Sequence, residues 1–466
     1  MGDYRPTIGL EVHAELKTAT KMFCNSKNDP DEGRPNVNVC PVCMAFPGTL
    51  PVVNRVAVGH VLKVGAAVGG TLADYTEFDR KNYFYPDLPK GYQISQYEYP
   101  LVKGGTLAGV QLTRIHLEED TANSKHVGDS SIVDFNRAGI PLMELVTEPV
   151  IHDATTASTF AKELQLLLRT LGVGEANMEK GQMRVEANIS ISKTETFGTK
   201  IEVKNLNSFK SVERAIEFEI KRQTEVLESG GTLVQETRGF DEDRGVTFSQ
   251  RIKESSHDYR YFPDPDIPKF RLSLIDAYTG DAMYRSLPEL PWQTRARLLA
   301  QGITREAAEI ILSDHIYAEI YAVAVEPIEN TDERNVAANY LFGPIRGMNP
   351  SHQELRNLEK QLGTTAAIVV AGGMSSTAGI RVLEEVIKTG KDPNQIIDEK
   401  GLRLVTDIDA IQKIVEQVLA ENENVVRDLK AGKQEAIQYL IGQGMKLSHG
   451  SAKPELLRKA ILSKFN

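Results

Sequence analysis

The feature that most constrains the fold of this chain is a strict alternation of apolar and polar residues in three short segments. They are residues 7–16 (TIGLEVHAEL), 183–191 (MRVEANISI) and 200–204 (KIEVK). In the first segment, Ile8, Leu10 and Val12 lie on one face of an extended chain. Glu11 and His13 lie on the other face. A period of two is typical of strands that are buried on one side only, so we predict a sheet with one apolar and one polar face.

The pattern changes near residue 290, where residues 287–291 (LPELP) hold two prolines that resist both helix and central strand. Before this point, the strands are interspersed with helical stretches at 154–171 and 211–228. Beyond it, nearly every segment has helical periodicity. We predict an α+β fold in three parts. They are a mixed α+β body at 1–290, a helical domain at 291–405 and a small helical tail domain at 406–466.

The composition is that of a soluble globular protein, because 41% of the 466 residues are hydrophobic and 25% are charged. No apolar run approaches the roughly 20 residues that a membrane-spanning helix needs. The N-terminus lacks the apolar core of a signal peptide. We therefore expect a cytoplasmic location and no membrane partner.

A local excess of positive charge marks the end of the chain. The net charge of −10 argues against simple coating of nucleic acid, but residues 427–466 hold eight Lys/Arg against three Asp/Glu. This tail is the best candidate for contact with a polyanion, and an ordinary solvated helical surface is the alternative. The lysines that we single out for this contact are Lys430, Lys433, Lys446 and Lys453.

The polar faces of the predicted strands carry carboxylates. Glu11 accompanies His13 in the first strand, and Glu186 and Glu202 occupy the other two. A fourth segment, residues 114–120 (RIHLEED), ends in three acids. Carboxylate oxygens with one imidazole suit Mg²⁺ or Mn²⁺, so a sheet facing a cleft could assemble a metal site. Solvated acids on half-exposed strands are the alternative.

The sequence contains no recognisable nucleotide-binding loop, since neither Gly-x-x-x-x-Gly-Lys-Ser/Thr nor a Gly-x-Gly-x-x-Gly fingerprint after a strand is present. Residues 368–377 (IVVAGGMSST) look like a strand running into a phosphate loop, but they lack the lysine and lie among helices. We expect a helix–turn–helix joint there. Any nucleotide would have to be held by a metal and scattered basic residues.

Residues 78–87 (FDRKNYFYPD) combine aromatic rings with charges. Cations for phosphate and rings for bases suit a site for a phosphate or a terminal nucleotide. A packed aromatic corner with a salt bridge is the alternative. Arg80 and Lys81 are the cations of this segment.

The three cysteines, Cys24, Cys40 and Cys43, are too few for a disulfide framework. Cys40 and Cys43 have the spacing of half a tetrahedral zinc site, and Cys24 could add a third ligand. A fourth ligand is missing from the pattern. A redox pair and buried structural thiols are the alternatives.

Several of these segments together resemble the B-subunit family of tRNA-dependent amidotransferases. The matching segments are residues 8–13 (IGLEVH), 78–87 (FDRKNYFYPD), 91–96 (GYQISQ), 116–120 (HLEED), 136–142 (NRAGIPL), 204–209 (KNLNSF), 258–263 (DYRYFP) and 442–446 (GQGMK). They occur in order from about residue 7 onward, and several are long and unusual in composition.

The resemblance implies a cradle-shaped, mainly antiparallel catalytic domain, then a helical domain and a tail that grips misacylated tRNA. It implies a heterotrimer in which a glutaminase A subunit releases ammonia from glutamine and a small C subunit wraps the interface. The implied activity uses ATP to phosphorylate the side-chain carboxylate of Glu-tRNA(Gln), Asp-tRNA(Asn) or both, before ammonia converts it to the amide. A non-catalytic tRNA-binding scaffold in the same complex is the alternative. The archaeal relative carries an extra insertion domain, for which this sequence has no room.

The resemblance also implies roles for single residues. It implies Mg²⁺ held through His13, Glu119 and Glu202, with Glu11 and Glu186 nearby as ligands of its waters or of a second ion. The candidates for contact with the phosphates of ATP are Arg80, Lys81 and Lys204.

Three positions depart from the family pattern. Glu186 stands where the family usually has Asp, so a longer side chain must reach the same place. Strict alternation puts Glu118 on the polar face, but we follow the resemblance to Glu119 and expect the strand to end or bulge there. Ser26 stands where zinc-binding members carry a fourth cysteine, so Zn²⁺ needs an outside ligand or is absent.

Overall fold

The computed structural model describes residues 4–252, 259–404, 408–430, 433, 435–448 and 451–465. Asp258 of the 258–263 motif and the side chain of Lys430 lie outside the described residues. The chain divides into two compact units, Met1–Pro291 and Trp292–Asn466.

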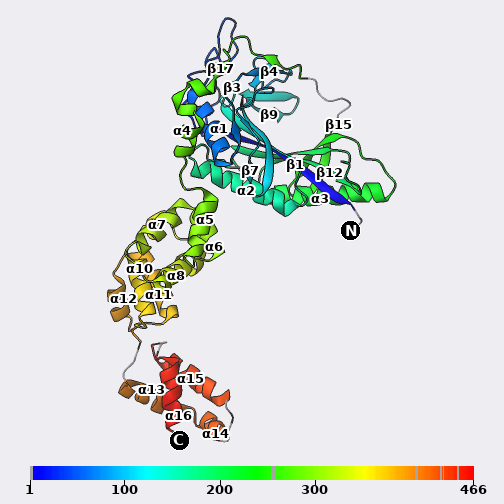
Figure 1. The fold of residues 1–466 in the computed structure, drawn as a ribbon. Helices are drawn as coiled ribbons and strands as arrows, with labels where there is room; N and C mark the ends of the chain where they lie inside the picture. Colours follow the sequence, from blue (N-terminus) through cyan, green and yellow to red (C-terminus); the bar gives the residue numbers. More distant parts are fainter. Residues whose placement is uncertain are drawn as a thin grey trace. The chain divides into compact units, whose positions relative to one another are not determined.

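One large sheet organises the first unit (Figure 1). In order across the sheet, its strands are β15 (Val246–Ile252), β14 (Glu236–Asp241), β13 (Ile201–Leu206), β12 (Met183–Ser192), β1 (Arg5–Glu15), β11 (Pro141–Thr147), β8 (Val110–Glu119), β6 (Val102–Lys103) and β2 (Thr71–Leu72), with β7 (Thr106–Leu107) paired to β8. β13 and β14 run parallel, and the other neighbouring pairs are antiparallel. The α+β fold predicted from the sequence is confirmed.

Two long helices, α2 (Ala154–Thr170) and α3 (Phe209–Glu228), cover the apolar face of this sheet (Figure 1). Asp153 and Ser208 cap their N-termini with side-chain oxygens that accept backbone N–H groups. Ile8, Leu10 and Val12 of β1 are at most 1% exposed, because this face is sealed by the helices. Burial of the apolar residues fixes the orientation of β1 and leaves its acids and His13 on the opposite face.

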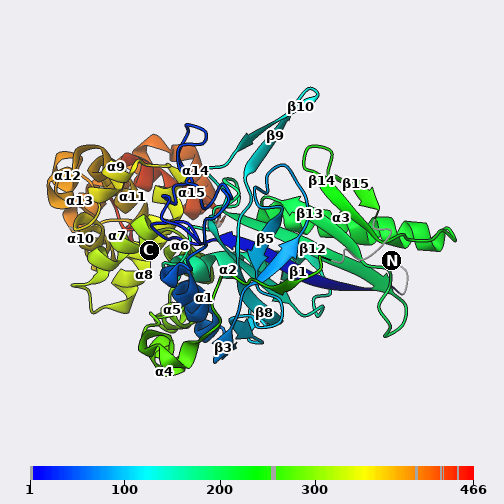
Figure 2. The same ribbon diagram turned by 90° about the horizontal axis from the view of Figure 1, so that it is seen from above.

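Shorter elements lie on the polar side of the sheet (Figure 2). β5 packs against β8, because the Ile94 N–H and the Ser95 hydroxyl donate to the side chains of Glu119 and Glu118. The three small sheets are β16 (Phe262–Pro263) with β4 (Asp79–Asn82) and β5 (Tyr92–Ser95), β17 (Phe270–Arg271) with β3 (Tyr75–Thr76), and β10 (Ser130–Asp134) with β9 (Asn123–Val127). The short helices of the unit are α1 (Arg55–Ala67), η1 (Leu272–Leu274), η2 (Asp276–Tyr278) and α4 (Gly280–Arg285).

The described part of the second unit is helical. Its helices are α5 (Pro291–Ala300, which begins at the boundary), α6 (Arg305–Ser313), α7 (His315–Val325), α8 (Thr331–Tyr340), η3 (Leu341–Ile345), α9 (His352–Arg356), α10 (Gln361–Val370), α11 (Ser376–Thr389), α12 (Pro393–Glu399), α13 (Ile408–Glu421), α14 (Glu423–Lys430), α15 (Glu435–Leu447) and α16 (Pro454–Ser463). Its buried apolar residues form two separate clusters, one between Leu298 and Leu402 and one between Ile411 and Ile461. The turn between α10 and α11 confirms the helix–turn–helix joint predicted at 368–377.

In the part of the chain that the structure describes, no helix combines the length and apolar character needed to cross a bilayer.

Candidate metal and phosphate site

Three adjacent strands assemble a row of titratable side chains across the polar face. β1 and β11 pair His13 with Glu144, and β11 and β8 pair Glu144 with His116. Directly paired residues of neighbouring antiparallel strands project from the same face of the sheet. Glu118 follows His116 by two residues and so shares that face. Strand pairing alone therefore brings these four side chains together.

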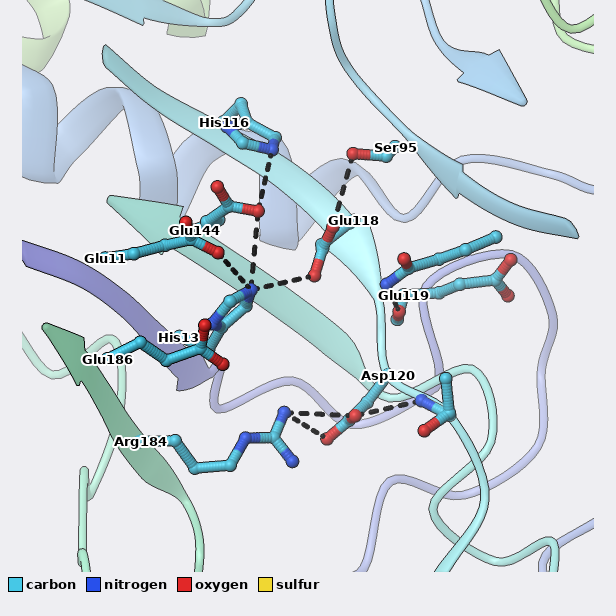
Figure 3. A network of polar contacts seen from close by, with 12 residues as sticks. Glu11, His13, Ser95, His116, Glu118, Glu119, Asp120, Glu144, Arg184 and Glu186 are labelled. Atoms are coloured by element: carbon cyan, nitrogen blue, oxygen red, sulfur yellow. Dashed lines mark hydrogen bonds and ion pairs between the residues drawn. The ribbon is translucent and has the colours of Figure 1, made fainter. Parts of the chain in front are cut away.

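The imidazole of His13 is the centre of this group (Figure 3). Its Nε2 lies 3.3 Å from Oε1 of Glu118, 3.3 Å from Oε2 of Glu144 and 3.9 Å from Oε1 of Glu11. Nε2 of His116 lies 3.3 Å from the same Glu144 oxygen. Burial opposes a charge on His13, but its hydrogen bonds to Glu118 and Glu144 raise its pKa well above the usual value.

A second group of acids continues along the same face. β1 and β12 pair Glu11 with Glu186. Lys204 of β13 lies among these acids, with Nζ 2.7 Å from Glu186 and 3.5 Å from Glu202. Oε2 of Glu202 accepts a 2.8 Å hydrogen bond from the hydroxyl of Thr237 on β14. The structure thus brings together Glu11, Glu186, Lys204 and Glu202, although Glu202 lies two strands away from His13.

The chemistry of this face fits a divalent cation. Burial and the nearby carboxylate of Glu144 raise the pKa of Glu11 to about 7. The positive charges of His13 and Lys204 therefore do not fully offset burial and the negative charge of the neighbouring acids. Carboxylate oxygens and imidazole nitrogens are donors that suit Mg²⁺ or Mn²⁺. Two triads have donor atoms close enough to share an ion, and they are Glu11, His13 and Glu144, and His116, Glu118 and Glu144.

Glu119 points away from His13 (Figure 3). Its carboxylate accepts the Ile94 N–H at 2.9 Å and forms an ion pair with Lys90 at 2.7 Å. β8 keeps a regular register with β11 up to Glu119 and ends there, so the expected strand end is present, without a bulge at this position. Glu118, and not Glu119, therefore lies beside His13, while the metal-ligand role predicted for Glu119 stays a prediction.

Lys81 lies beside the same acids. Burial opposes its charge, but the carboxylates of Glu118 and Glu144 raise the pKa of its ammonium well above the usual value. Its Nζ also lies 5.1 Å from the ring centroid of Tyr259. Lys81 therefore holds a stable positive charge next to the candidate metal ligands, as a contact for phosphate requires.

Arg80 has a different environment. It forms ion pairs with Asp264 at 2.8 Å and with Asp266 at 2.9 Å, and its guanidinium lies 4.3 Å from the ring centroid of Tyr92. These contacts form a packed aromatic corner with a salt bridge, which was the alternative to a phosphate site in our interpretation of residues 78–87. The phosphate contact predicted for Arg80 stays a prediction.

The three cysteines form a second cluster in the first unit. Their sulfurs lie within 4.8 Å of one another, and those of Cys40 and Cys43 are 3.8 Å apart. Cys24 is the third member. No His, Asp or Glu completes this set among the described residues. The Ser26 hydroxyl and the Lys21 ammonium lie 3.7 Å and 3.8 Å from the Cys43 sulfur. A neutral hydroxyl and a fixed cation do not complete a closed tetrahedral zinc site, so these residues do not fit one.

The same contacts set the charge of Cys43. The hydrogen bond from the Cys24 thiol, the Cys40 N–H and the Lys21 ammonium lower the pKa of Cys43 to about 4, although burial opposes them. The pKa of Cys24 is raised, chiefly by the same hydrogen bond to Cys43. The cluster therefore concentrates one negative charge on the Cys43 sulfur.

The predicted tail lysines lie at helix ends of the second unit. Lys433 forms an ion pair with Asp428 at 2.9 Å. Lys446 is exposed in the last turn of α15, and Lys453 precedes α16. Their contact with tRNA stays a prediction.

The sequence analysis did not assign Glu144, His116 or Glu118 to the site. Glu144 interrupts an otherwise apolar run at 140–147 (IPLMELVT), and it is only 5% exposed. A single acid inside a buried strand was the available signal, because a carboxylate is rarely buried without a partner. His116 and Glu118 follow from strict alternation in β8.

The fold and the site define an α+β protein whose large sheet presents an imidazole–carboxylate cluster suited to a divalent cation. Residues 6–275 match the family model of the GatB/GatE catalytic domain, and residues 324–465 match that of the GatB domain. The chain belongs to the family of aspartyl/glutamyl-tRNA(Asn/Gln) amidotransferase B subunits, which are components of ligase-type amidotransferases.

Curated relatives named as B subunits of aspartyl/glutamyl-tRNA(Asn/Gln) amidotransferase are similar over their whole length. The Persephonella marina protein is 42% identical over 474 residues, which cover 98% of this chain and 99% of the relative. The Moorella thermoacetica protein is 42% identical over 485 residues, with coverages of 98% and 99%. A Thermus thermophilus protein is 41% identical over 468 residues, with coverages of 98% and 98%.

Proposed function

We propose that this chain uses ATP and a divalent ion to activate the side-chain carboxylate of misacylated tRNA, as one subunit of a tRNA amidotransferase. The substrates are Glu-tRNA(Gln), Asp-tRNA(Asn) or both, and the products are Gln-tRNA(Gln) and Asn-tRNA(Asn). The observation that carries this proposal is the convergence of two histidines and several carboxylates on one sheet face, beside two lysines. Family membership supports the tRNA substrate.

The chemistry requires activation, because the oxygen of an ionised carboxylate is a poor leaving group for attack by ammonia. In the proposed first step, a carboxylate oxygen bonds to the γ-phosphorus of ATP, the bond to the bridging oxygen breaks and ADP leaves. Ammonia then bonds to the acyl carbon, and inorganic phosphate leaves with the electron pair of the broken C–O bond. A bound Mg²⁺ would neutralise and align the phosphates.

The residues of this chain divide between two tasks. The ligands that would hold the ion are Glu11, His13, Glu118 and Glu144, with Glu186 and Glu202 as holders of its waters or of a second ion. Lys81 and Lys204 would contact the phosphates, since both ammonium groups lie beside these acids. Together they position the reactants and stabilise charge, which is the main protein contribution to phosphoryl transfer.

The proposal includes partners. Membership of a B-subunit family implies further chains, and we propose a glutaminase A subunit as the source of ammonia and a small C subunit at their interface. Lys446 and Lys453 of the tail would contact tRNA phosphates, where each cation adds a salt-dependent contribution to binding.

The test is transamidation by the purified complex with Glu-tRNA(Gln) and Asp-tRNA(Asn) side by side. We expect Glu202→Ala to abolish ATP-dependent amide formation while the partner still releases ammonia from glutamine. The matched control is Glu217→Gln, an exposed acid on α3, which should keep full activity. Normal amide formation by the Glu202 variant would contradict the role of this face.

A non-catalytic tRNA-binding scaffold is the competing function. It predicts that loss of the acids leaves both tRNA binding and ATP turnover intact. ADP release that requires charged tRNA and is lost with Glu202 favours the catalytic role over the scaffold.

A further inference from the structure

The cysteine cluster contains a buried cation that the proposed function does not use. The side chain of Lys21 is completely inaccessible to solvent. Its Nζ donates a 3.1 Å hydrogen bond to the carbonyl of Phe135 and faces the Cys43 sulfur at 3.8 Å. Among the described residues, no carboxylate forms an ion pair with Lys21. Burial lowers the pKa of the Lys21 ammonium and the neighbouring cysteines oppose this change, so a nearby anion favours its charged form, and the Cys43 sulfur is the group in that position.

Several groups that stabilise a thiolate face the Cys43 sulfur, which also lies 3.5 Å from the Cys40 carbonyl oxygen. The backbone N–H of Cys40 donates to it at 3.1 Å, and the Ser26 hydroxyl lies 3.7 Å away. With the Lys21 ammonium, these contacts supply positive potential from several directions. The thiolate is the reactive form of cysteine, and a positive environment favours this form.

A second thiol lies within reach. The sulfurs of Cys40 and Cys43 are 3.8 Å apart, so modest side-chain rotations would bring them to the roughly 2 Å of a disulfide. Because only two residues separate the cysteines, a disulfide between them would close a small ring. A thiolate next to a neutral thiol is the arrangement that a dithiol redox site needs.

A cavity of about 190 Å³ gives small molecules a route to this sulfur. Cys24 and Cys43 line one part of its wall, and Lys90, Tyr92 and Glu119 line another. The cavity is therefore polar, and its volume suits a reagent of a few heavy atoms.

We propose that Cys43 is the nucleophile of a metal-independent dithiol site whose oxidant is a small hydroperoxide and whose resolving thiol is Cys40. The thiolate attacks the distal peroxide oxygen, the O–O bond breaks, and Cys43 becomes a sulfenic acid, while the departing hydroxide or alkoxide takes one proton from solvent and leaves as water or an alcohol. The Cys40 thiol then attacks the sulfenic sulfur, the S–O bond breaks, and a disulfide and one water form. The two cysteines lose two electrons in total, and the peroxide gains them. This site is independent of the proposed function.

Oxidation has a structural consequence. The disulfide removes the anion that faces Lys21 and leaves its ammonium buried without compensation. Met22, the next residue, donates its N–H to the carbonyl of Gly139 at 2.7 Å, and the Gly139 N–H donates to the carbonyl of Asp120 at 2.9 Å. These backbone hydrogen bonds connect the residue after Lys21 to the loop that follows β8.

The test combines zinc content with the alkylation rate of each cysteine in the purified complex. We expect substoichiometric zinc, with Cys43 alkylated fastest by iodoacetamide at pH 7. Hydrogen peroxide should join Cys40 and Cys43 in peptides mapped by mass spectrometry, and dithiothreitol should reverse the link. Lys21→Met should move the midpoint of the pH dependence of Cys43 alkylation upward by about one pH unit, because the ammonium is one of several groups that lower the pKa of this thiol. The matched control, Lys27→Met, alters an exposed lysine and should react as the wild type does.

A second variant separates the dithiol from a metal site. Because the Ser26 oxygen lies 3.7 Å from the Cys43 sulfur, Ser26→Cys would supply a fourth sulfur. We expect this variant to bind one zinc ion and to protect Cys43 from alkylation. Stoichiometric zinc in the wild-type chain, equal zinc content in the two proteins, or an unchanged pH midpoint of Cys43 alkylation in Lys21→Met would each overturn the proposal.

Discussion

Nε2 of His13 lies 3.3 Å from Oε1 of Glu118, whereas the adjacent Glu119 forms an ion pair with Lys90. The two neighbouring acids should therefore respond differently to the same change. We expect Glu118→Gln to reduce ATP-dependent amide formation at least tenfold, because it removes a charged donor from the candidate metal site. Amide formation by the purified complex is the measurement.

Glu119→Gln should act on stability instead. It leaves the partly buried Lys90 ammonium without its anion and weakens the bond to the Ile94 N–H. We expect the unfolding free energy of the first unit to fall by about 1–3 kcal/mol, seen as a lower melting temperature in calorimetry. If Glu119→Gln abolished amide formation and Glu118→Gln did not, Glu119 and not Glu118 would be the acid that acts with His13.

The hydroxyl of Thr237 orients Glu202 through a 2.8 Å hydrogen bond between buried groups. Thr237→Val keeps the shape of the side chain and removes the donor. A hydrogen bond to a charged group contributes about 1.5–3 kcal/mol, so we expect roughly tenfold more Mg²⁺ to be needed for half-maximal activity. Thr237→Ser retains the hydroxyl and should restore the wild-type dependence. A Mg²⁺ dependence that is identical in all three proteins would rule out this positioning role.

The main features of the site could be predicted from the sequence because they depend on strand periodicity. The alternation in residues 7–16 is sufficient to put Glu11 and His13 on one face, and the same rule puts Glu118 there. In the structure Glu118 lies beside His13, as strict alternation predicts, and β8 ends at Glu119; the metal-ligand role of Glu119 stays a prediction. Glu144 was missed because its contribution depends on which strands are neighbours, and strand order is a property of the tertiary fold.

The environment of the charged residues was harder to predict than their positions along the strands. Arg80 and Lys81 are adjacent in the sequence, yet one pairs with Asp264 and the other lies beside Glu118. The pairing of β4 with β5 and β16 decides which of the two cations lies beside Glu118. Likewise, the Cys-x-x-Cys spacing does not reveal that a buried lysine lies beside the sulfurs.

His60 of α1 provides a pH dependence away from the site. Burial lowers its pKa, the hydrogen bond that its Nε2–H donates to the Lys17 carbonyl opposes this, and the nearby Lys63 lowers it further. The pKa of His60 in the unfolded chain is about 6.5. Above this pH, the imidazole is neutral in both the folded and the unfolded protein, and its burial costs no stability. As the pH falls further, the unfolded state binds a proton first, so stability is lost until the folded pKa is passed.

We therefore expect the melting temperature of the first unit to fall more steeply between pH 7.5 and pH 5 in the wild type than in His60→Gln. Calorimetry of both proteins across this range is the measurement. Parallel curves for the two proteins would show that His60 is not the group responsible.

The central claim is that the imidazole and carboxylates on the polar face form one divalent-ion site. Electron paramagnetic resonance of Mn²⁺ titrated into the full chain tests it most directly, with Glu144→Gln as the variant and Glu217→Gln as the control. Glu144 belongs to both candidate triads, so its loss should weaken Mn²⁺ binding at least tenfold while the control binds as the wild type does. Equal Mn²⁺ affinity in wild type and Glu144→Gln would contradict the claim.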